Sequence, residues 1–224
     1  MRVLLPVRPD NDCAEAARIL ETLFGREEVS VLRLFVYRPA EADLYDPELL
    51  TVFSGVHRLD ERQLQDVIAK TKAHCRSLLD HGFHVENAVV VGFPIEKILA
   101  EARIWRADLI VLHVTEEKLR EARIGRIVGS LIDTSPLPIL IYSKASPTIG
   151  KRIGVLGNGA REWAERLATR QGGEVVEVRE EQLLRNDCDL LVMQAHHHFA
   201  PALFGSAERR IVRHAEVPVA LIPQ

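Results

Sequence analysis

The chain has few cysteines, and their arrangement does not favour pairing. Cys13, Cys75 and Cys188 are odd in number, widely separated and outside any Cys-x-x-Cys pair. Regularly spaced cysteines indicate disulfide-stabilised secreted domains, and close thiolate pairs indicate zinc sites. The sequence therefore predicts three reduced thiols that fill space in the core, without a disulfide framework or a thiolate metal site.

Long hydrophobic runs and blocks of one charge are also missing. The longest apolar stretches, such as DLIVLHV and PILIY, are far shorter than the ~20 residues that a membrane helix needs. MRVLLPV at the N-terminus leads into a strand pattern without the anatomy of a signal peptide. The formal net charge is −3 and no Lys/Arg tract stands out, which disfavours a nucleic-acid partner. We therefore expect a cytoplasmic protein with no nucleic-acid partner and no membrane insertion.

Familiar catalytic motifs are absent as well. The sequence contains no Gly-x-Ser-x-Gly elbow, no His-Glu-x-x-His pair and no Walker motif. We expect a protein that binds rather than catalyses. ATP hydrolysis stays an open alternative, because one fold can carry many chemistries.

What the chain does contain is an ending that occurs twice. GRIVGSLIDTSPLPILIY starts at Gly125, and GSAERRIVRHAEVPVALIP starts at Gly205. Gly125 and Pro138 are thirteen positions apart, as are Gly205 and Pro218. Similarity at a fixed distance indicates duplicated structural units, here a helix followed by a strand.

The rest of the chain alternates apolar strands with helix-length segments. In the first half, strands are expected at residues 3–7, 29–37, 84–91, 107–114 and 137–142. A helix between the first two places Ala16, Ile19, Leu20 and Leu23 on one face, with Asp12 as its expected cap and Gly25 as its end. Near-continuous apolar strands separated by helices predict a parallel sheet covered on both faces.

A second, shorter unit follows a segment rich in Ser, Pro and Gly. We expect a domain at residues 1–143, a linker at 144–151 and a shortened domain at 152–224. Strands of the second unit are expected at residues 152–156, 173–179, 188–195 and 217–222. The fold class is α/β, with two doubly wound parallel-sheet modules of which the second is abbreviated. Because a core of this size is only marginally stable by itself, we expect the second module to be stabilised by packing against the first.

These motifs together resemble the universal stress protein family in a tandem form. The resemblance rests on VGFPIEKILAEARIWRADLIVLHV and on the two Gly-to-Pro endings. It implies a fold of the adenine nucleotide alpha hydrolase-like type, a role in the stress response and ligands bound beyond the carboxyl ends of the strands. Dimers in the family commonly pair through their last strands, so PILIY and PVALI are the expected seam of an internal pseudo-dimer. An open edge strand also permits a larger homo-oligomer.

Some members of this family bind ATP through a loop with three spaced glycines, the last followed by Ser or Thr. Counting back from Gly125 places Leu112 and Thr115 at the two earlier glycine positions, with Arg126 at the Ser/Thr position. Glu116 and Glu117 add negative charge where a triphosphate would lie. Side chains at glycine positions obstruct the close approach of backbone N–H groups to phosphates.

The other nucleotide positions also depart from the family pattern. In the family pattern, the first strand of each half ends with an aspartate that is associated with the adenosine part of the ligand. Arg8 and Asn158 occupy that position in the two halves of this chain. Asp10 could take over the role of this aspartate in the first half only if the turn is remodelled. Gly205 and Ser206 fit the pattern in the second half. We therefore expect a regulatory or interaction module without standard ATP binding and with no certain cofactor. The alternatives are a sensor that binds ATP or another adenine nucleotide, and a regulatory partner of a membrane transporter.

Three further segments leave alternatives open. His196 and His198, in a run of three histidines, point to the same side on extended backbone, where they either belong to a loose loop or hold a metal or an anion. GNGA at residues 157–160 is favoured as a plain turn over a phosphate loop. The connection at residues 38–59 is either a binding surface or a short helix on the domain's own core.

Overall fold

The computed structural model describes residues 1–8, 13–37, 69, 76–115, 125–144, 147–179, 187–195 and 207–223. The elements of the first half are β1 (Arg2–Val7), α1 (Ala14–Phe24), η1 (Arg26–Glu28), β2 (Ser30–Tyr37), α4 (Arg76–Asp80), β3 (His84–Val91), α5 (Pro94–Ile104), β4 (Leu109–His113), α7 (Arg126–Thr134) and β5 (Ile139–Tyr142). Those of the second half are β6 (Arg152–Leu156), η3 (Asn158–Ala160), α8 (Arg161–Gln171), β7 (Glu174–Glu177), β8 (Leu190–Ala195), α9 (Ala207–His214) and β9 (Val219–Pro223). The α/β fold class and all nine expected strands are confirmed.

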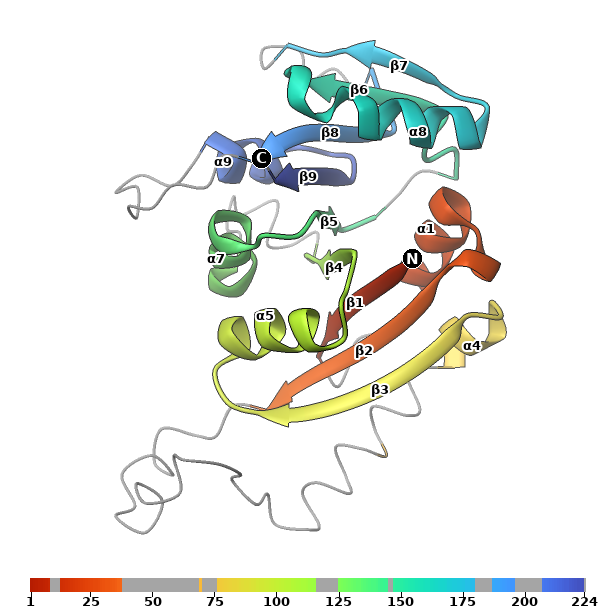
Figure 1. Cartoon of the computed structure of the whole chain (residues 1–224). Coiled ribbons are helices and arrows are strands. Elements are labelled where there is room, and N and C mark those ends of the chain that lie inside the picture. The colour runs from red at the N-terminus through yellow and green to blue at the C-terminus, as the bar shows by residue number, and fades with distance from the viewer. Residues whose placement is uncertain are drawn as a thin grey trace, which may run out of the picture.

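The strands form one continuous sheet in the order β3-β2-β1-β4-β5-β9-β8-β6-β7 (Figure 1). Neighbouring strands are parallel everywhere except where β5 meets β9. The second half repeats the first without a described strand in the place of β3. A doubly wound sheet therefore runs through both halves of the chain.

The antiparallel pairing of β5 with β9 joins the two halves. Ile139 lies opposite Leu221, Leu140 opposite Ala220 and Ile141 opposite Val219. The spacing of 80 positions between Gly125 and Gly205 makes Ala220 the counterpart of Leu140. The ladder is thus centred on a pair of equivalent residues, as expected for two copies related by a local twofold axis. These strands are the PILIY and PVALI segments that the family resemblance implied would pair, and their pairing is confirmed.

Helices cover both faces of the sheet, and each face forms one apolar cluster that spans both halves. One cluster packs beneath α1, α4 and α8, and the other beneath α5, α7 and α9 (Figure 1). Ala16, Ile19, Leu20 and Leu23 of α1 are fully buried in the first cluster, as their spacing predicts. The second half therefore shares its core with the first.

The described part of α1 starts after Cys13, which stands at the N-cap position and makes no capping hydrogen bond with its side chain. The predicted cap, Asp12, lies outside the described residues. Glu15 pairs with Arg18 on the helix surface at 2.7 Å. The end of the helix is as predicted, at Gly25.

Polar contacts link the halves on both faces. On one face, Arg209 of α9 donates to the carbonyl oxygen of Gly129 at 3.0 Å and forms an ion pair with Asp133 of α7. A Cβ at Gly129 would lie 3.2 Å from Cζ of Arg209, so glycine permits this close approach. On the other face, Gln171 of α8 donates to the carbonyl oxygen of Thr22 in α1.

The expected linker is anchored where it enters the second half. The carboxylate of Asp189 accepts hydrogen bonds from the backbone N–H groups of Gly150 at 2.8 Å, Lys151 at 3.1 Å and Arg152 at 3.1 Å. Ile149 is buried in the shared core. Asp108, before β4, similarly accepts from the N–H of Arg2 at 2.7 Å. The carboxylates before β4 and β8, which occupy equivalent places beside β1 and β6, thus fix the starts of β1 and β6.

None of the described helices has the length and apolar character needed to cross a membrane.

Replacement of Asp189 tests this anchor. Because three backbone donors lose a buried charged acceptor, we expect Asp189→Ala to lower the free energy of unfolding by about 3 kcal/mol. Asp189→Asn keeps one acceptor oxygen and should cost less. Asp187→Ala, an exposed neighbour, is the control and should change stability by less than about 0.5 kcal/mol. Urea denaturation measures all three, and equal midpoints for Asp189→Ala and the control would contradict the assignment.

Candidate pocket at the strand ends

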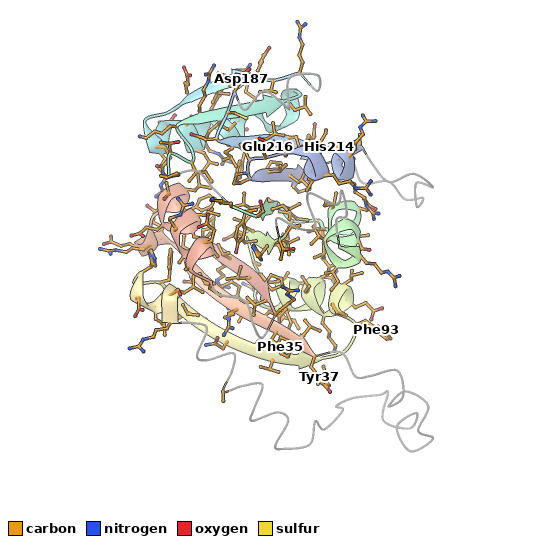
Figure 2. All side chains as sticks on the ribbon, turned by 180° about the vertical axis from the view of Figure 1, so that it is seen from behind. Phe35, Tyr37, Phe93, Asp187, His214 and Glu216 are labelled. Carbon is orange, nitrogen blue, oxygen red and sulfur yellow. The ribbon has the colours of Figure 1, made fainter. Side chains whose placement is uncertain are left out.

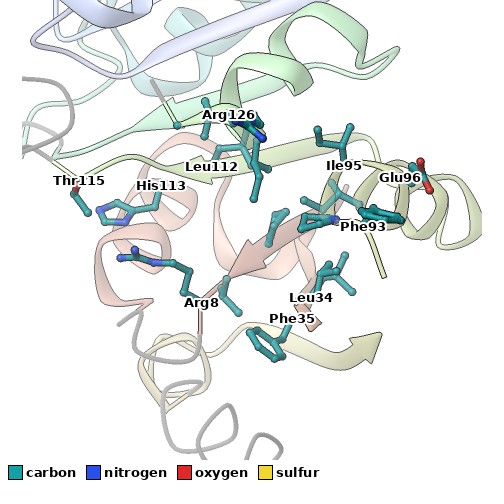
Figure 3. Close-up of a pocket in the computed structure, with 18 residues that line it drawn as sticks. Arg8, Leu34, Phe35, Phe93, Ile95, Glu96, Leu112, His113, Thr115 and Arg126 are labelled. Carbon is teal, nitrogen blue, oxygen red and sulfur yellow. The ribbon is translucent and has the colours of Figure 1, made fainter. Parts of the chain in front are cut away.

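A cavity lies at the carboxyl ends of the parallel strands in the first half. β1 stands between β2 on one side and β4 on the other, so the order of connection reverses at this point of the sheet. A crevice opens where the chain leaves neighbouring strands in opposite directions. Here it is a cavity of about 940 Å³, bounded by the ends of β1, β2 and β4 and by the starts of α5 and α7 (Figure 3). Its volume lies within the range of small-molecule pockets, about 300–1,000 Å³.

Most of the lining is apolar. Aliphatic and aromatic side chains come from the three strands and from the first turns of the two helices, among them Leu34, Phe35, Phe93, Ile95, Leu112 and Ile127. Phe35 and Phe93 lie at the same end of the molecule, where β2 ends and α5 begins (Figure 2). Large apolar side chains around a cavity favour an apolar ligand part.

Polar side chains are few in the described lining and unevenly placed. They belong to Arg8, Glu96, His113, Thr115 and Arg126. Arg8, His113 and Thr115 gather at one end of the pocket, whereas Glu96 lies at the other end with Phe93 and Ile95 (Figure 3). The ring of His113 is held against that of Tyr142, with centroids 5.1 Å apart. The pocket therefore has a cationic end at Arg8 and an opposite end where one carboxylate stands beside apolar side chains.

Two helix N-termini add to the positive potential. α5 begins after Phe93 and α7 begins after Gly125, and neither N-cap residue forms a side-chain hydrogen bond to its helix. The first N–H groups of a helix lack intrahelical partners and carry the positive end of its dipole. Together with Arg8 and Arg126, this arrangement favours an anionic ligand group.

Four of the site residues predicted from the sequence meet in this pocket: Arg8, Thr115, Gly125 and Arg126. Asn158 lies in the other half, in η3. Asp10, His196, His198, Gly205 and Ser206 lie outside the described residues, as do Glu116 and Glu117. Residues 60–68, 70–75 and the connection at 38–59 are also outside them.

Sequence reasoning missed Phe93, Glu96 and His113. Their positions carry a signal that could have found them, since His113 ends an apolar strand and Phe93 lies in the Gly-x-Pro turn after another. Residues that follow parallel strands gather at one edge of the sheet, which is where ligands bind in this kind of fold.

The glycine-loop positions have clear structural roles. Leu112 lies inside β4, where it is opposite Ile141, and it is only 4% exposed. Its side chain forms part of the pocket wall, in space that a glycine would leave empty. Gly125 has φ −54° and ψ 147°, a conformation that other residues also adopt. The backbone here does not depend on glycine at the positions where the ATP-binding pattern has it.

In the second half, a side chain packs against the turn after β6. η3 follows β6, and a Cβ at Gly159 would lie 1.9 Å from Oε1 of Gln194 in β8. Gln194 therefore lies against the backbone of this turn, in the space that a phosphate held by GNGA would need. This packing supports the plain turn over the phosphate loop.

Reactive groups for catalysis are scarce in the part of the chain that the structure describes. No group of three or more His, Cys, Asp or Glu side chains there is placed to hold a metal ion. Cys13 is buried, and Cys188 is a free thiol. Burial raises the pKa of the Cys188 thiol, and the charges of Asp189 and Asp187 act in the same direction. A raised pKa keeps the thiol protonated and makes it a poor nucleophile at neutral pH.

Comparison with known families and structures gives a consistent result. The model of the universal stress protein family matches residues 1–143 and 168–223. No curated protein matches the chain. A universal stress protein structure from Archaeoglobus fulgidus DSM 4304 is 14% identical, with a TM-score of 0.71, over 100% of this chain and 96% of that chain. The structure of a putative universal stress protein from Pseudomonas aeruginosa UCBPP-PA14 is 14% identical, with a TM-score of 0.60, over 99% and 92% of the two chains.

Another structure is that of a universal stress protein from Archaeoglobus fulgidus in complex with dAMP. It is 17% identical and has a TM-score of 0.43, over 63% of this chain and 96% of that chain. The first two likenesses, both to proteins of very different sequence, establish the fold over nearly the whole chain.

The contact between Gly159 and Gln194 is testable by a double-mutant cycle. Because the added methyl group displaces the Gln194 side chain, Gly159→Ala should lower the free energy of unfolding by about 1 kcal/mol. In a Gln194→Ala background the same change should cost much less, which gives a coupling of about 0.5–1 kcal/mol. Additive effects of the two substitutions in chemical denaturation would show that the two residues do not interact.

Proposed function

The chain belongs to the universal stress protein family, and we propose that it is a regulatory module of the stress response that acts by binding rather than by catalysis. The observation that carries this proposal is the pocket at the strand ends of the first half. It is large and mostly apolar, and Leu112, Thr115 and Arg126 occupy the positions that the ATP-binding pattern gives to glycines and Ser/Thr. A mostly apolar lining supports a role in which ligand binding changes interactions with a partner.

The glycine-loop mode of ATP binding is disfavoured for steric reasons. Phosphate groups in such loops contact backbone N–H groups directly, which requires residues without side chains. Leu112 is paired with Ile141 inside the sheet, and its buried side chain forms part of the pocket wall. We therefore propose that the pocket does not hold a triphosphate in the manner of the ATP-binding relatives.

An adenine-nucleotide sensor is the second candidate function. It is favoured by the N-terminus of α7, where Gly125 is retained and Arg126 adds a positive charge at the pocket. In this case the nucleotide would bind with its phosphates at α7, in a pose that tolerates Leu112 and Thr115.

We further propose that the two halves act as an internal pseudo-dimer. The ladder of β5 and β9 is centred on the equivalent residues Leu140 and Ala220 and uses the edge strand of each half. Because β5 is already paired within the chain, a homo-oligomer must form through other surfaces. β3 and β7 are the outer strands of the described sheet, so they are the candidate edges for such assembly.

Titration with ATP and Mg²⁺ tests the proposed function. A site with a Kd of about 10 µM would add about 2.7 kcal/mol of stability at about 1 mM ATP, which a thermal-unfolding assay detects easily. We expect no saturable rise in Tm and no phosphate release above the buffer rate. The double variant Thr115→Gly, Arg126→Ser restores two family positions and serves as the comparison. It should bind ATP more tightly than the natural sequence.

Two results would contradict the proposal in different ways. A saturable rise in Tm at micromolar ATP, abolished by Arg126→Glu, would favour the nucleotide sensor. Steady release of phosphate from ATP would establish an enzyme and remove the binding-only role.

A further inference from the structure

The cationic end of the pocket is chemically suited to an acceptor group. Arg8 directly follows β1 and lines the pocket, beside His113 and Thr115 (Figure 3). A guanidinium group has five N–H donors and no acceptor, and its planar fork matches the two oxygens of a carboxylate. A ligand group with oxygen acceptors and a negative charge is therefore favoured at this end.

The opposite end carries apolar side chains beside Glu96, and part of the apolar lining of the pocket is exposed to solvent. Phe93, at that end, is 45% exposed, and Ile127, elsewhere in the lining, is 41% exposed. Large apolar side chains that surround a cavity while remaining open to water are typical of a surface that a ligand covers. Ile95 and Leu34 continue the same apolar wall toward the strand ends.

The position of Glu96 favours one orientation of a charged ligand in the pocket. It is placed with Phe93 and Ile95, away from Arg8 (Figure 3). A carboxylate there repels a second anion, whereas Arg8 at the other end attracts it. Glu96 disfavours an anionic group beside Phe93 and Ile95, so the charges favour a ligand whose anionic head lies at the end with Arg8 and whose tail at Phe93 is uncharged.

From these observations we propose that the pocket binds an elongated apolar carboxylate of the acyl-chain type. Its carboxylate lies at the end formed by Arg8, His113 and Thr115, and its chain extends along Leu34 and Ile95 toward Phe93. This inference rests on the proposed function, because it names the ligand class of the same regulatory pocket. It also explains why a cavity with cationic groups is walled mostly by hydrocarbon.

Isothermal titration of the full chain with decanoate tests the ligand class. Decan-1-ol, which has the same chain and no charge, is the matched ligand. We expect saturable binding of one decanoate per chain and at least tenfold weaker binding of decan-1-ol. The cationic end should account for this difference.

Variants of exposed pocket residues locate the two ends without disturbing the core. Arg8→Ala should weaken decanoate binding at least tenfold and leave decan-1-ol binding unchanged, whereas Arg8→Lys should retain part of the affinity. Phe93→Glu should weaken both ligands, since it places a charge beside the chain. Arg166→Ala, an exposed arginine on α8 outside the pocket, should bind decanoate as the natural sequence does.

Several outcomes would overturn the inference. Equal affinity for decanoate and decan-1-ol, or an unchanged affinity in Arg8→Ala, would remove the role of the cationic end. Absence of decanoate binding would remove the ligand class, whether or not ATP binds. None of these results bears on the proposed binding-only role, which fails instead if the protein turns over ATP.

Discussion

The antiparallel pairing of β5 with β9 is the interaction on which the rest of the structure depends. Every other pair of neighbouring strands is parallel and lies within one half, so this ladder alone joins the halves into one sheet. Once the sheet is continuous, helices on each face can bury their apolar sides against both halves at once. The two clusters therefore extend across the seam, and the second half needs no separate core of its own.

Contacts at the seam make the pairing specific to unlike halves. Arg209 of α9 stands 80 positions after Gly129 of α7, so these two residues are equivalent in the two halves. The side chain of Arg209 donates to the carbonyl oxygen of Gly129 and forms an ion pair with Asp133. Two copies of the first half would place glycine opposite glycine and leave Asp133 without this arginine. The ladder itself is nearly symmetric, whereas the helix contacts are not. Divergence of the two copies thus favours association within the chain over association of like halves.

Much of the fold was predictable because it follows from local pattern. The apolar strands, the buried face of α1 and Pro94 at the start of α5 all follow from spacing and backbone preference. The anchor formed by Asp189 was not predictable, because its three donors lie 37 to 39 positions earlier and meet it only in the folded chain. Arg8, Thr115, Gly125 and Arg126 were identified through resemblance, while His113, Phe93 and Glu96 required knowledge of which strand ends are neighbours.

The two halves repeat one architecture but differ at the carboxyl ends of their parallel strands. In the first half, the crevice beside β1 is an open cavity with mostly apolar walls and with Arg8 at one end. In the second half, the side chain of Gln194 packs against the turn after β6, at Gly159. An unfilled cavity lowers the free energy of unfolding. The shared core offsets this loss, because joining the two halves buries apolar surface that neither half would bury alone.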